Sequence, residues 1–416
     1  MKKLIEYSLY LLVLLLPWQT RWIWEVGEWE YVSKSLYGTE ILLGLIFLIS
    51  IIYVVKNFQL SIINFQWIFK LILNWKKIFK IILATLCLCF FVLLSAILAL
   101  DSSLSFYYLS KILAGVILIM LIYSFAGFTK TAYAFIAGMA IQAGLGIWQF
   151  LSQSSFASKW LGMAMQNASN LGSSVIETSD GRWLRAYGAL PHPNIFAGFL
   201  VIAIFLIFIL KLKKRKILIF FLPILSTALF FTFSRAAWIA LIISLLFYLL
   251  INLKNRITFK KIVSLSFICF LIPVIFSFIY LPLSKARIGG AERLEVKSNI
   301  ERIEYFSESL RIIKTYPFFG AGYGNYTLAV QNLINPNRES FAYQPVHNIY
   351  LFILSEIGVL GFLCLSVFLI IILSFNILLV PVLILGLFDH YLLSLYSGIM
   401  LISLCISLSQ KSTNTG

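Results

Sequence analysis

The sequence predicts an all-α fold: a polytopic bundle of about twelve transmembrane helices with a partly helical extracytoplasmic loop. Three observations support this prediction. The chain of 416 residues is 61% hydrophobic and only 12% charged, whereas about 25% of the residues of an ordinary soluble domain are charged. Apolar stretches long enough to cross a bilayer as helices recur along the chain. These stretches lack the polar–apolar alternation that membrane-spanning strands show.

The apolar stretches divide the chain by length. We place the spans at about 4–20, 38–55, 81–100, 107–126, 132–151, 188–210, 217–233, 236–253, 262–281, 348–373, 377–389 and 391–409. The first span follows Met1, Lys2 and Lys3, as in a signal peptide, but no small-residue cleavage site comes after it, so we expect it to be retained. The prediction is one polytopic membrane domain over residues 1–416.

The net charge of +17 is explained by topology rather than by a nucleic-acid partner. More than half of the 33 lysines and arginines fall in the short segments that share a side with the N-terminus, including Lys70 and the run 211–216. The acidic residue on that side is Glu6. Because basic loops stay in the cytoplasm, both termini are predicted to be cytoplasmic. The five cysteines lie in apolar spans without metal-ligand spacing, and no disulfide is expected.

Three polar segments are predicted on the outer side. Residues 18–37 are rich in tryptophan, which favours the membrane interface, and residues 152–187 are rich in serine and asparagine. The long extracytoplasmic loop 282–346 contains an amphipathic helix at about 299–315, with Ser298 or Asn299 as its cap and Pro317 after its end. Its apolar residues recur every three or four positions: Ile300, Ile303, Phe306, Leu310 and Ile313.

Arg235 is placed at membrane depth, in the first turn of a span and in a turn too tight to be a loop. A cation there is unfavourable beside the helix N-terminus and costly near hydrocarbon. A phosphate would satisfy both the arginine and the helix end. The alternative is a snorkelling arginine at the headgroups.

The three histidines all fall at outer span ends. His192 can serve a turn in which Asn194 caps the following helix, and His390 beside Asp389 can close a hairpin. Glu356 lies nine residues after His347, on the opposite face of a helix, so we expect it to bond neighbouring helices. The glycine-rich run 320–324 lacks the preceding strand of a dinucleotide site and is read as a turn.

His347 is the strongest candidate for chemistry. It joins the longest outer loop to a span and is flanked by Asn348 and Tyr350. A neutral imidazole is a suitable general base near pH 7. If it faces the same cavity as Arg185 and Arg235, the site combines a base with phosphate clamps and has no metal ligands. That set suits group transfer from a lipid-linked pyrophosphate donor.

At these motifs the sequence resembles the O-antigen ligase and O-antigen polymerase superfamily, over roughly residues 180–400. Four stretches carry the resemblance and occur in the family's order: Arg185–Asn194, Phe233–Trp238, Tyr316–Tyr326 and His347–Gly361. The resemblance implies a multi-pass protein of the bacterial inner membrane whose active site is on the extracytoplasmic face. It implies a glycosyltransferase that uses no metal or other cofactor.

The resemblance also implies partners and residue roles. The donor is a glycan linked to undecaprenyl diphosphate, and the acceptor is a hydroxyl of a glycolipid or another glycan. His347 is the implied catalytic base, and Arg185 and Arg235 bind the donor diphosphate. Possible supporting residues are Arg302, His192, Asn348, Tyr350, Asp389 and His390.

The motifs leave ligase, polymerase and protein O-glycosylation open. The alternative of another class is a flippase or other transporter of lipid-linked saccharides. A transporter more often places ionisable residues at mid-membrane within broken helices. Here they gather at one membrane face, which favours the enzyme.

Overall fold

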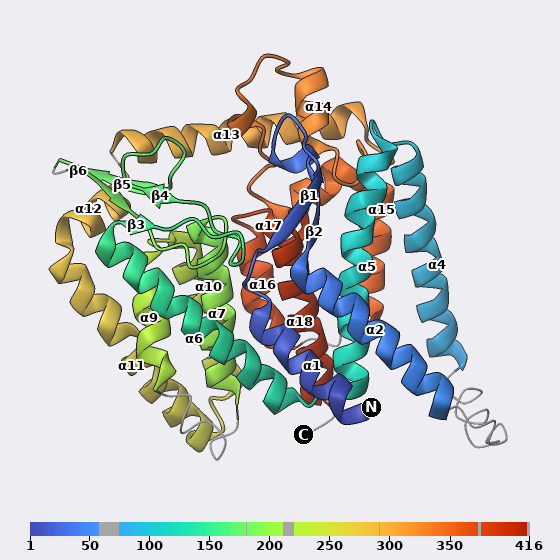
Figure 1. The fold of residues 1–416 in the computed structure, drawn as a ribbon, viewed down its shortest axis with the longest axis horizontal. Helices are drawn as coiled ribbons and strands as arrows, with labels where there is room; N and C mark the ends of the chain where they lie inside the picture. The colour runs from blue at the N-terminus through green and yellow to red at the C-terminus, as the bar shows by residue number, and fades with distance from the viewer. Residues whose placement is uncertain (58–74, 180, 211–219, 291, 373–375, 414–416) are drawn as a thin grey trace.

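The computed structural model describes residues 1–57, 75–179, 181–210, 220–290, 292–372 and 376–413. The basic residues Lys70 and 211–216 therefore lie outside the described residues. The described part is a bundle of α-helices (Figure 1). In chain order they are α1 (Lys2–Leu15), α2 (Gly38–Asn57), α4 (Trp75–Ile97), α5 (Ser102–Phe125), α6 (Phe128–Ser152), α7 (Pro193–Ile209), α9 (Phe221–Phe231), α10 (Arg235–Ile251), α11 (Arg256–Ile279), α12 (Leu281–Gly289), α13 (Arg293–Thr315), α14 (Tyr326–Leu333), α15 (Ile349–Ile372), α16 (Leu379–Gly386), α17 (Tyr391–Ser394) and α18 (Tyr396–Thr413).

The helices confirm the all-α membrane architecture in its coarse form. Within the described residues, five helices are long and apolar enough to cross a membrane: α2, α5, α6, α11 and α15. Each of the twelve predicted spans overlaps a helix, but several of these helices are shorter than a full crossing. The number of spans therefore stays a prediction.

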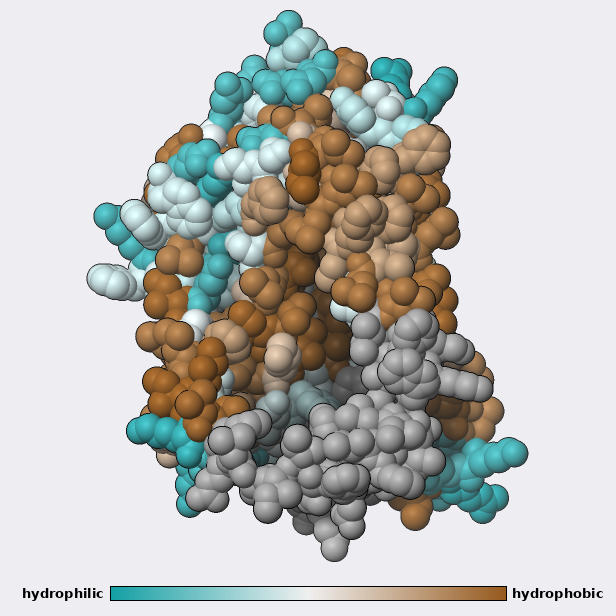
Figure 2. Space-filling model, turned by 90° about the vertical axis from the view of Figure 1, so that its right-hand side faces the viewer, coloured by the Kyte–Doolittle hydropathy of each residue, from teal (hydrophilic) through white to brown (hydrophobic). Residues whose placement is uncertain are grey.

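The surface has the polarity that a bilayer requires. Figure 2 shows hydrophobic side chains over a broad middle band of one face, with hydrophilic side chains gathered towards both ends. In Figure 1 both chain ends lie at the end of the bundle opposite α13, as an even number of crossings requires.

The tryptophan-rich segment forms a β-hairpin with a 3-10 turn between its strands: β1 (Arg21–Glu25), η1 (Glu30–Val32) and β2 (Lys34–Tyr37). Trp22 and Trp24 are exposed, as predicted for interfacial rings, but Trp29 is buried. Its indole stacks on Tyr343 and donates a 3.0 Å hydrogen bond to Thr327 Oγ1. The N-terminal hairpin thus packs against the long outer loop.

The second outer segment contains two short antiparallel pairs. These are β3 (Ser154–Ser155) with β4 (Gln166–Asn167), and β5 (Val175–Thr178) with β6 (Gly181–Leu184). The hairpin β5–β6 leads directly to Arg185. It also contacts α12 and α13 of the long loop.

The predicted loop helix exists as α13, but it starts earlier than expected. Its N-cap is Glu292, so the proposed caps Ser298 and Asn299 are wrong. Figure 1 shows α13 lying across the outer end of the bundle, over the ends of the spans. The apolar stripe predicted from the sequence does not face the core: Ile303, for example, is 71% exposed. The helix instead buries Glu295, Tyr305, Glu308, Ser309 and Ile312.

The exposed stripe has a physical explanation. Periodicity shows that a helix has an apolar side, but it does not show what covers that side. At the outer end of a membrane bundle, the inward side of α13 covers polar groups of the span ends, so its polar side turns inward.

The tenth predicted span, α15, is broken at Gly358. This residue has φ 67° and ψ −178°, a conformation that is essentially restricted to glycine. A Cβ at this position would lie 2.4 Å from the carbonyl carbon of Phe318. Because the helix is interrupted, the Val359 N–H donates to the Pro317 carbonyl at 2.9 Å instead of to its own helix.

The glycine-rich run 320–324 fills this break and is a turn, as predicted. Its Gly322 N–H donates to the Glu356 carbonyl at 2.9 Å. The Glu356 side chain accepts a hydrogen bond from the Tyr326 N–H at 3.1 Å, and its carbonyl also accepts one from Ser95 Oγ. Glu356 therefore bonds neighbouring elements, as expected, and does not contact His347.

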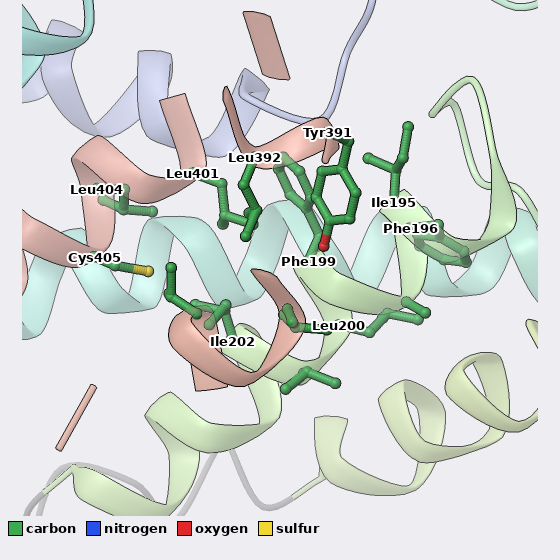
Figure 3. Close-up of a cluster of buried hydrophobic side chains, with 14 of the residues drawn as sticks. Ile195, Phe196, Phe199, Leu200, Ile202, Tyr391, Leu392, Leu401, Leu404 and Cys405 are labelled. Atoms are coloured by element: carbon green, nitrogen blue, oxygen red, sulfur yellow. The ribbon is translucent and has the colours of Figure 1, made fainter. Parts of the chain in front are cut away.

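Helix α7 is apolar on all sides and is almost fully buried, as expected for a helix enclosed by others. Figure 3 shows its residue Phe199 beside Tyr391 of α17, within a buried cluster that also contains Leu401 and Leu404 of α18. A Cβ at Gly198 would meet the Tyr391 hydroxyl at 1.8 Å, so a glycine is required. This packing fixes α17, and the residues just before it, against the N-terminal half of α7.

Gly358→Ala tests the break in α15. We expect it to lower the free energy of unfolding by ~1–3 kcal/mol. Alanine is strained at this φ, and its methyl group would meet the Phe318 backbone. Thermal unfolding in detergent measures the change. Gly144→Ala in α6 is the matched control, since its Cβ would have open space; equal melting temperatures for the two variants would contradict the analysis.

Candidate functional site

Three arginines from distant parts of the chain meet at the turn between α9 and α10. Arg235 belongs to this turn. The Arg185 Nε donates to the Thr232 carbonyl at 2.6 Å, and the Arg287 Nε donates to the Phe233 carbonyl at 2.8 Å. Phe233 has φ 48°, and such strained non-glycine residues cluster at functional sites. Arg185 and Arg287 thus bond successive carbonyls of the turn that leads into Arg235.

Arg185 is buried and bonded on every nitrogen. Besides the Thr232 carbonyl, its Nη1 donates to Ser174 Oγ and its Nη2 to Asn194 Oδ1, each at 2.7 Å. All three acceptors are neutral. Burial, followed by the nearby Arg287 cation, holds the pKa of Arg185 well below its usual value. An anion bound close by would offset both unfavourable effects.

Arg235 and Arg287 share one carboxylate. Glu295, in the first turn of α13, pairs with Arg287 through Oε1 and lies 3.1 Å from Arg235 Nη2 through Oε2. Arg235 also donates to the Arg287 carbonyl at 3.3 Å. The Arg235 side chain is 35% exposed, whereas those of Arg287 and Glu295 are nearly buried.

Arg302 lies two turns further along α13 and is half-buried. Its charge contributes to lowering the pKa of both Arg185 and Arg287, so its guanidinium belongs to the same cluster. Within the described part of the chain it makes no hydrogen bond or ion pair. Tyr305, one turn later, packs its ring 5.9 Å from the His347 ring.

His347 lies beside a carboxylate. Its Nδ1 is 3.5 Å from Asp389 Oδ1. His390 Nε2 approaches the same oxygen at 4.0 Å, and its Nδ1 is 2.7 Å from Ser394 Oγ. At 3.5 Å from Asp389, the His347 Nδ1 is buried and makes no hydrogen bond among the described residues. One carboxylate oxygen of Asp389 thus faces both imidazoles.

Asn348 and Tyr350 hold the start of α15. The Asn348 Oδ1 accepts from the backbone N–H of Tyr350 and of Leu351, which caps the helix. Its Nδ2 donates to the Leu387 carbonyl, and the Tyr350 hydroxyl donates to the Leu383 carbonyl at 3.1 Å. Both residues thus fix His347 against the segment that carries Asp389.

His192 lies between the arginines and the imidazole–carboxylate pair. It caps α7 itself, through Nδ1, which accepts from the Asn194 N–H; the prediction that Asn194 is the cap is wrong. Burial, then the Arg185 cation, lowers the pKa of His192 to about 3, and both Asp389 and His347 also act on it. One neutral imidazole is thus within electrostatic range of both groups.

Within the part of the chain that the structure describes, one group of residues has the chemistry to bind a metal ion. The ligand atoms of His347, Asp389 and His390 all lie within 4.8 Å of one another. Two imidazoles and a carboxylate are common ligands of zinc and related ions. The expectation of a metal-independent site is not tested by this geometry.

Sequence reasoning missed Arg287 and Glu295. Both lie in the long extracytoplasmic loop, where most charged side chains are solvated. A charged residue there gives no indication from the sequence that it belongs to a site. Sequence reasoning also assigned Asp389 to a hairpin with its neighbour His390 and did not connect it with His347. No spacing rule relates two residues on different helices, so packing alone reveals this contact.

Two comparisons with known proteins agree with the motifs. Residues 220–366 match the family model of the O-antigen ligases. The chain is also 29% identical over 178 residues to a ComP-specific O-oligosaccharyltransferase of Acinetobacter baylyi. That alignment covers 40% of this chain and 31% of the relative, so the chain matches about a third of the relative's length. The resemblance drawn from the motifs is confirmed, and residues 220–366 form an O-antigen ligase-like region of a multi-pass membrane protein.

Proposed function

We propose that the protein is a membrane glycosyltransferase that moves a glycan from undecaprenyl diphosphate to an acceptor hydroxyl. One observation carries the proposal: helix α13 contacts both a cluster of arginines and the His347 of an imidazole–carboxylate pair at the outer end of the bundle. The family match and the distant relative support the same class of reaction.

The arginine cluster has the charge to hold a diphosphate. Arg185, Arg235, Arg287 and Arg302 contribute four positive charges, and within the described residues the carboxylate that contacts them is Glu295. This surplus favours a multivalent anion, and guanidinium groups match phosphate oxygens geometrically. Because Arg185 is fully bonded to protein atoms, we assign direct contact with the donor first to Arg235. The role of Arg185 as a direct ligand stays a prediction.

His347 supplies the base. A carboxylate at Nδ1 favours the tautomer that carries its proton there and leaves Nε2 free to accept one, as in other imidazole–carboxylate pairs. Nε2 takes the proton of the acceptor hydroxyl as that oxygen bonds to the anomeric carbon. The bond from the anomeric carbon to the diphosphate oxygen breaks, and undecaprenyl diphosphate leaves against the arginines.

Two kinds of hydroxyl group are candidates for the acceptor. A sugar hydroxyl, on a glycolipid or on a second lipid-linked glycan, corresponds to ligase or polymerase activity. A protein hydroxyl is the second candidate, because the relative is named as a ComP-specific O-oligosaccharyltransferase.

We place the site on the extracytoplasmic face of the bacterial inner membrane, with both termini in the cytoplasm. The distribution of basic residues and the position of both chain ends opposite α13 support this orientation. A transporter remains the alternative of another class. The broken helix α15 is a feature of transporters as well, but the ionisable cluster lies at the outer ends of the helices, which favours an enzyme.

His347→Ala tests the catalytic assignment. Loss of a general base should reduce glycan transfer by about 10²–10⁴-fold, while membrane insertion and expression stay normal. Transfer is measured with purified protein and a lipid-linked donor. Asn337→Ala, at an exposed position of the same outer loop, is the control; undiminished activity of His347→Ala would exclude the mechanism.

A pair of lysine substitutions separates the roles of two arginines. Arg185→Lys should lower the free energy of unfolding by about 1–3 kcal/mol, because an ammonium group cannot reach three separate acceptors. Arg235→Lys, at a partly exposed position, should leave stability nearly unchanged and raise the KM for the donor. Thermal unfolding and donor titrations measure both; the reverse pattern would refute these assignments.

Chelation tests the proposed independence from metal. We expect transfer to continue at its full rate after dialysis against EDTA. If EDTA abolishes transfer and one divalent cation restores it, the proposed independence from metal is wrong, and His347, Asp389 and His390 become the candidate ligands.

A further inference from the structure

The Glu295 carboxylate occupies the space between two arginines of the proposed donor site. Each of its oxygens serves a different guanidinium: Oε1 pairs with Arg287, and Oε2 lies 3.1 Å from Arg235. The carboxyl group therefore spans the two cations as a small external oxyanion would. Its position marks where such an anion binds.

The two guanidinium groups are held in place without Glu295. Arg287 is fixed by its Nε, which donates to the Phe233 carbonyl. Arg235 is fixed by its Nη1, which donates to the Arg287 carbonyl at 3.3 Å. When the carboxylate leaves, the pair therefore remains positioned to receive another anion, and preorganised donors of this kind cost little on binding.

Three features make the carboxylate displaceable. Its Oε2 lies near Arg235 without the alignment of a hydrogen bond. Glu295 lies in the first turn of α13, and Gly290, with φ 67°, ends the preceding helix. The Arg235 side chain is 35% exposed, which leaves the pair open to an incoming ligand on one side.

We propose that Arg287 is a further donor-binding residue, and that Glu295 occupies the Arg235–Arg287 pair until the donor diphosphate displaces it. This inference rests on the proposed function. The carboxylate and the diphosphate cannot share the pair, because like charges at contact distance repel strongly. A ligand must therefore compete with the Glu295 carboxylate for the two guanidinium groups. A diphosphate, with several negative charges, competes better than an anion with a single charge.

Inorganic pyrophosphate is the probe, and binding to the full-length protein in detergent is measured by calorimetry. Glu295→Gln should bind pyrophosphate about tenfold more tightly than the native protein, equivalent to about 1.4 kcal/mol of lost competition. Glu301→Gln is the matched control. It removes one charge from the same helix, where the carboxylate contacts only Lys297 across one turn among the described residues, and it should leave the affinity unchanged.

Arg287→Lys provides the second test and does not depend on the folding of Glu295→Gln. It keeps the charge but loses the fork that contacts Glu295 and Phe233, and it should weaken pyrophosphate binding at least tenfold. Melting curves with and without pyrophosphate show that each variant is folded; the ligand should raise the melting temperature of Glu295→Gln more than that of the native protein.

The outcomes separate this inference from the proposed function. If Glu295→Gln binds no more tightly than the native protein, or if Arg287→Lys binds equally well, the inference is wrong and the donor site stands. If pyrophosphate binds to neither the native protein nor any variant, the anion site itself is absent and the proposed function fails with it.

Discussion

The exchange of backbone hydrogen bonds at Gly358 is the constraint on which the site depends. An uninterrupted helix would bond its own carbonyls and amides. At the break these groups bond to residues 317–322 instead. The middle of the long outer loop is thereby bonded to α15, one helix segment away from His347. The same turn reaches α5, where Ser105 Oγ donates to the Tyr323 carbonyl. The loop that covers the site is thus part of the bundle.

Helix α13 connects the two halves of the site. Its first turn carries Glu295 to the arginines, and its middle places Tyr305 against His347. Arg302 lies between them. A rise of about 1.5 Å per residue separates these positions by roughly 15 Å along the helix. One rigid element therefore sets the distance between the anion-binding group and the base, and its polar residues face inward for that reason.

Much of this could be predicted from the sequence, because the strongest signals were local. Apolar length located the helices, and scarcity made His347 and Arg235 conspicuous in a chain with few charges. The direction of the α13 stripe could not be predicted, since in a membrane protein an apolar side need not face a core. Arg287 and Glu295 could not be found for a different reason: a charge in a polar loop resembles a solvated one until packing shows its partner. The contact of Asp389 with His347 could not be found either, because the two residues lie on different segments that packing brings together.

The separation of the two groups has a chemical consequence for the proposed reaction. When a displacement at an anomeric carbon occurs in one step, the attacking oxygen and the leaving oxygen lie on opposite sides of that carbon. His347 contacts the middle of α13 through Tyr305, whereas Arg235 contacts its first turn through Glu295, and charges from both groups act on His192. The pKa of His192 is lowered by burial and by Arg185, so this residue stays neutral and adds no competing charge near the diphosphate. In the proposed reaction, the proton of the acceptor and the leaving diphosphate are therefore taken up by different residues, the first by His347 and the second by the arginines.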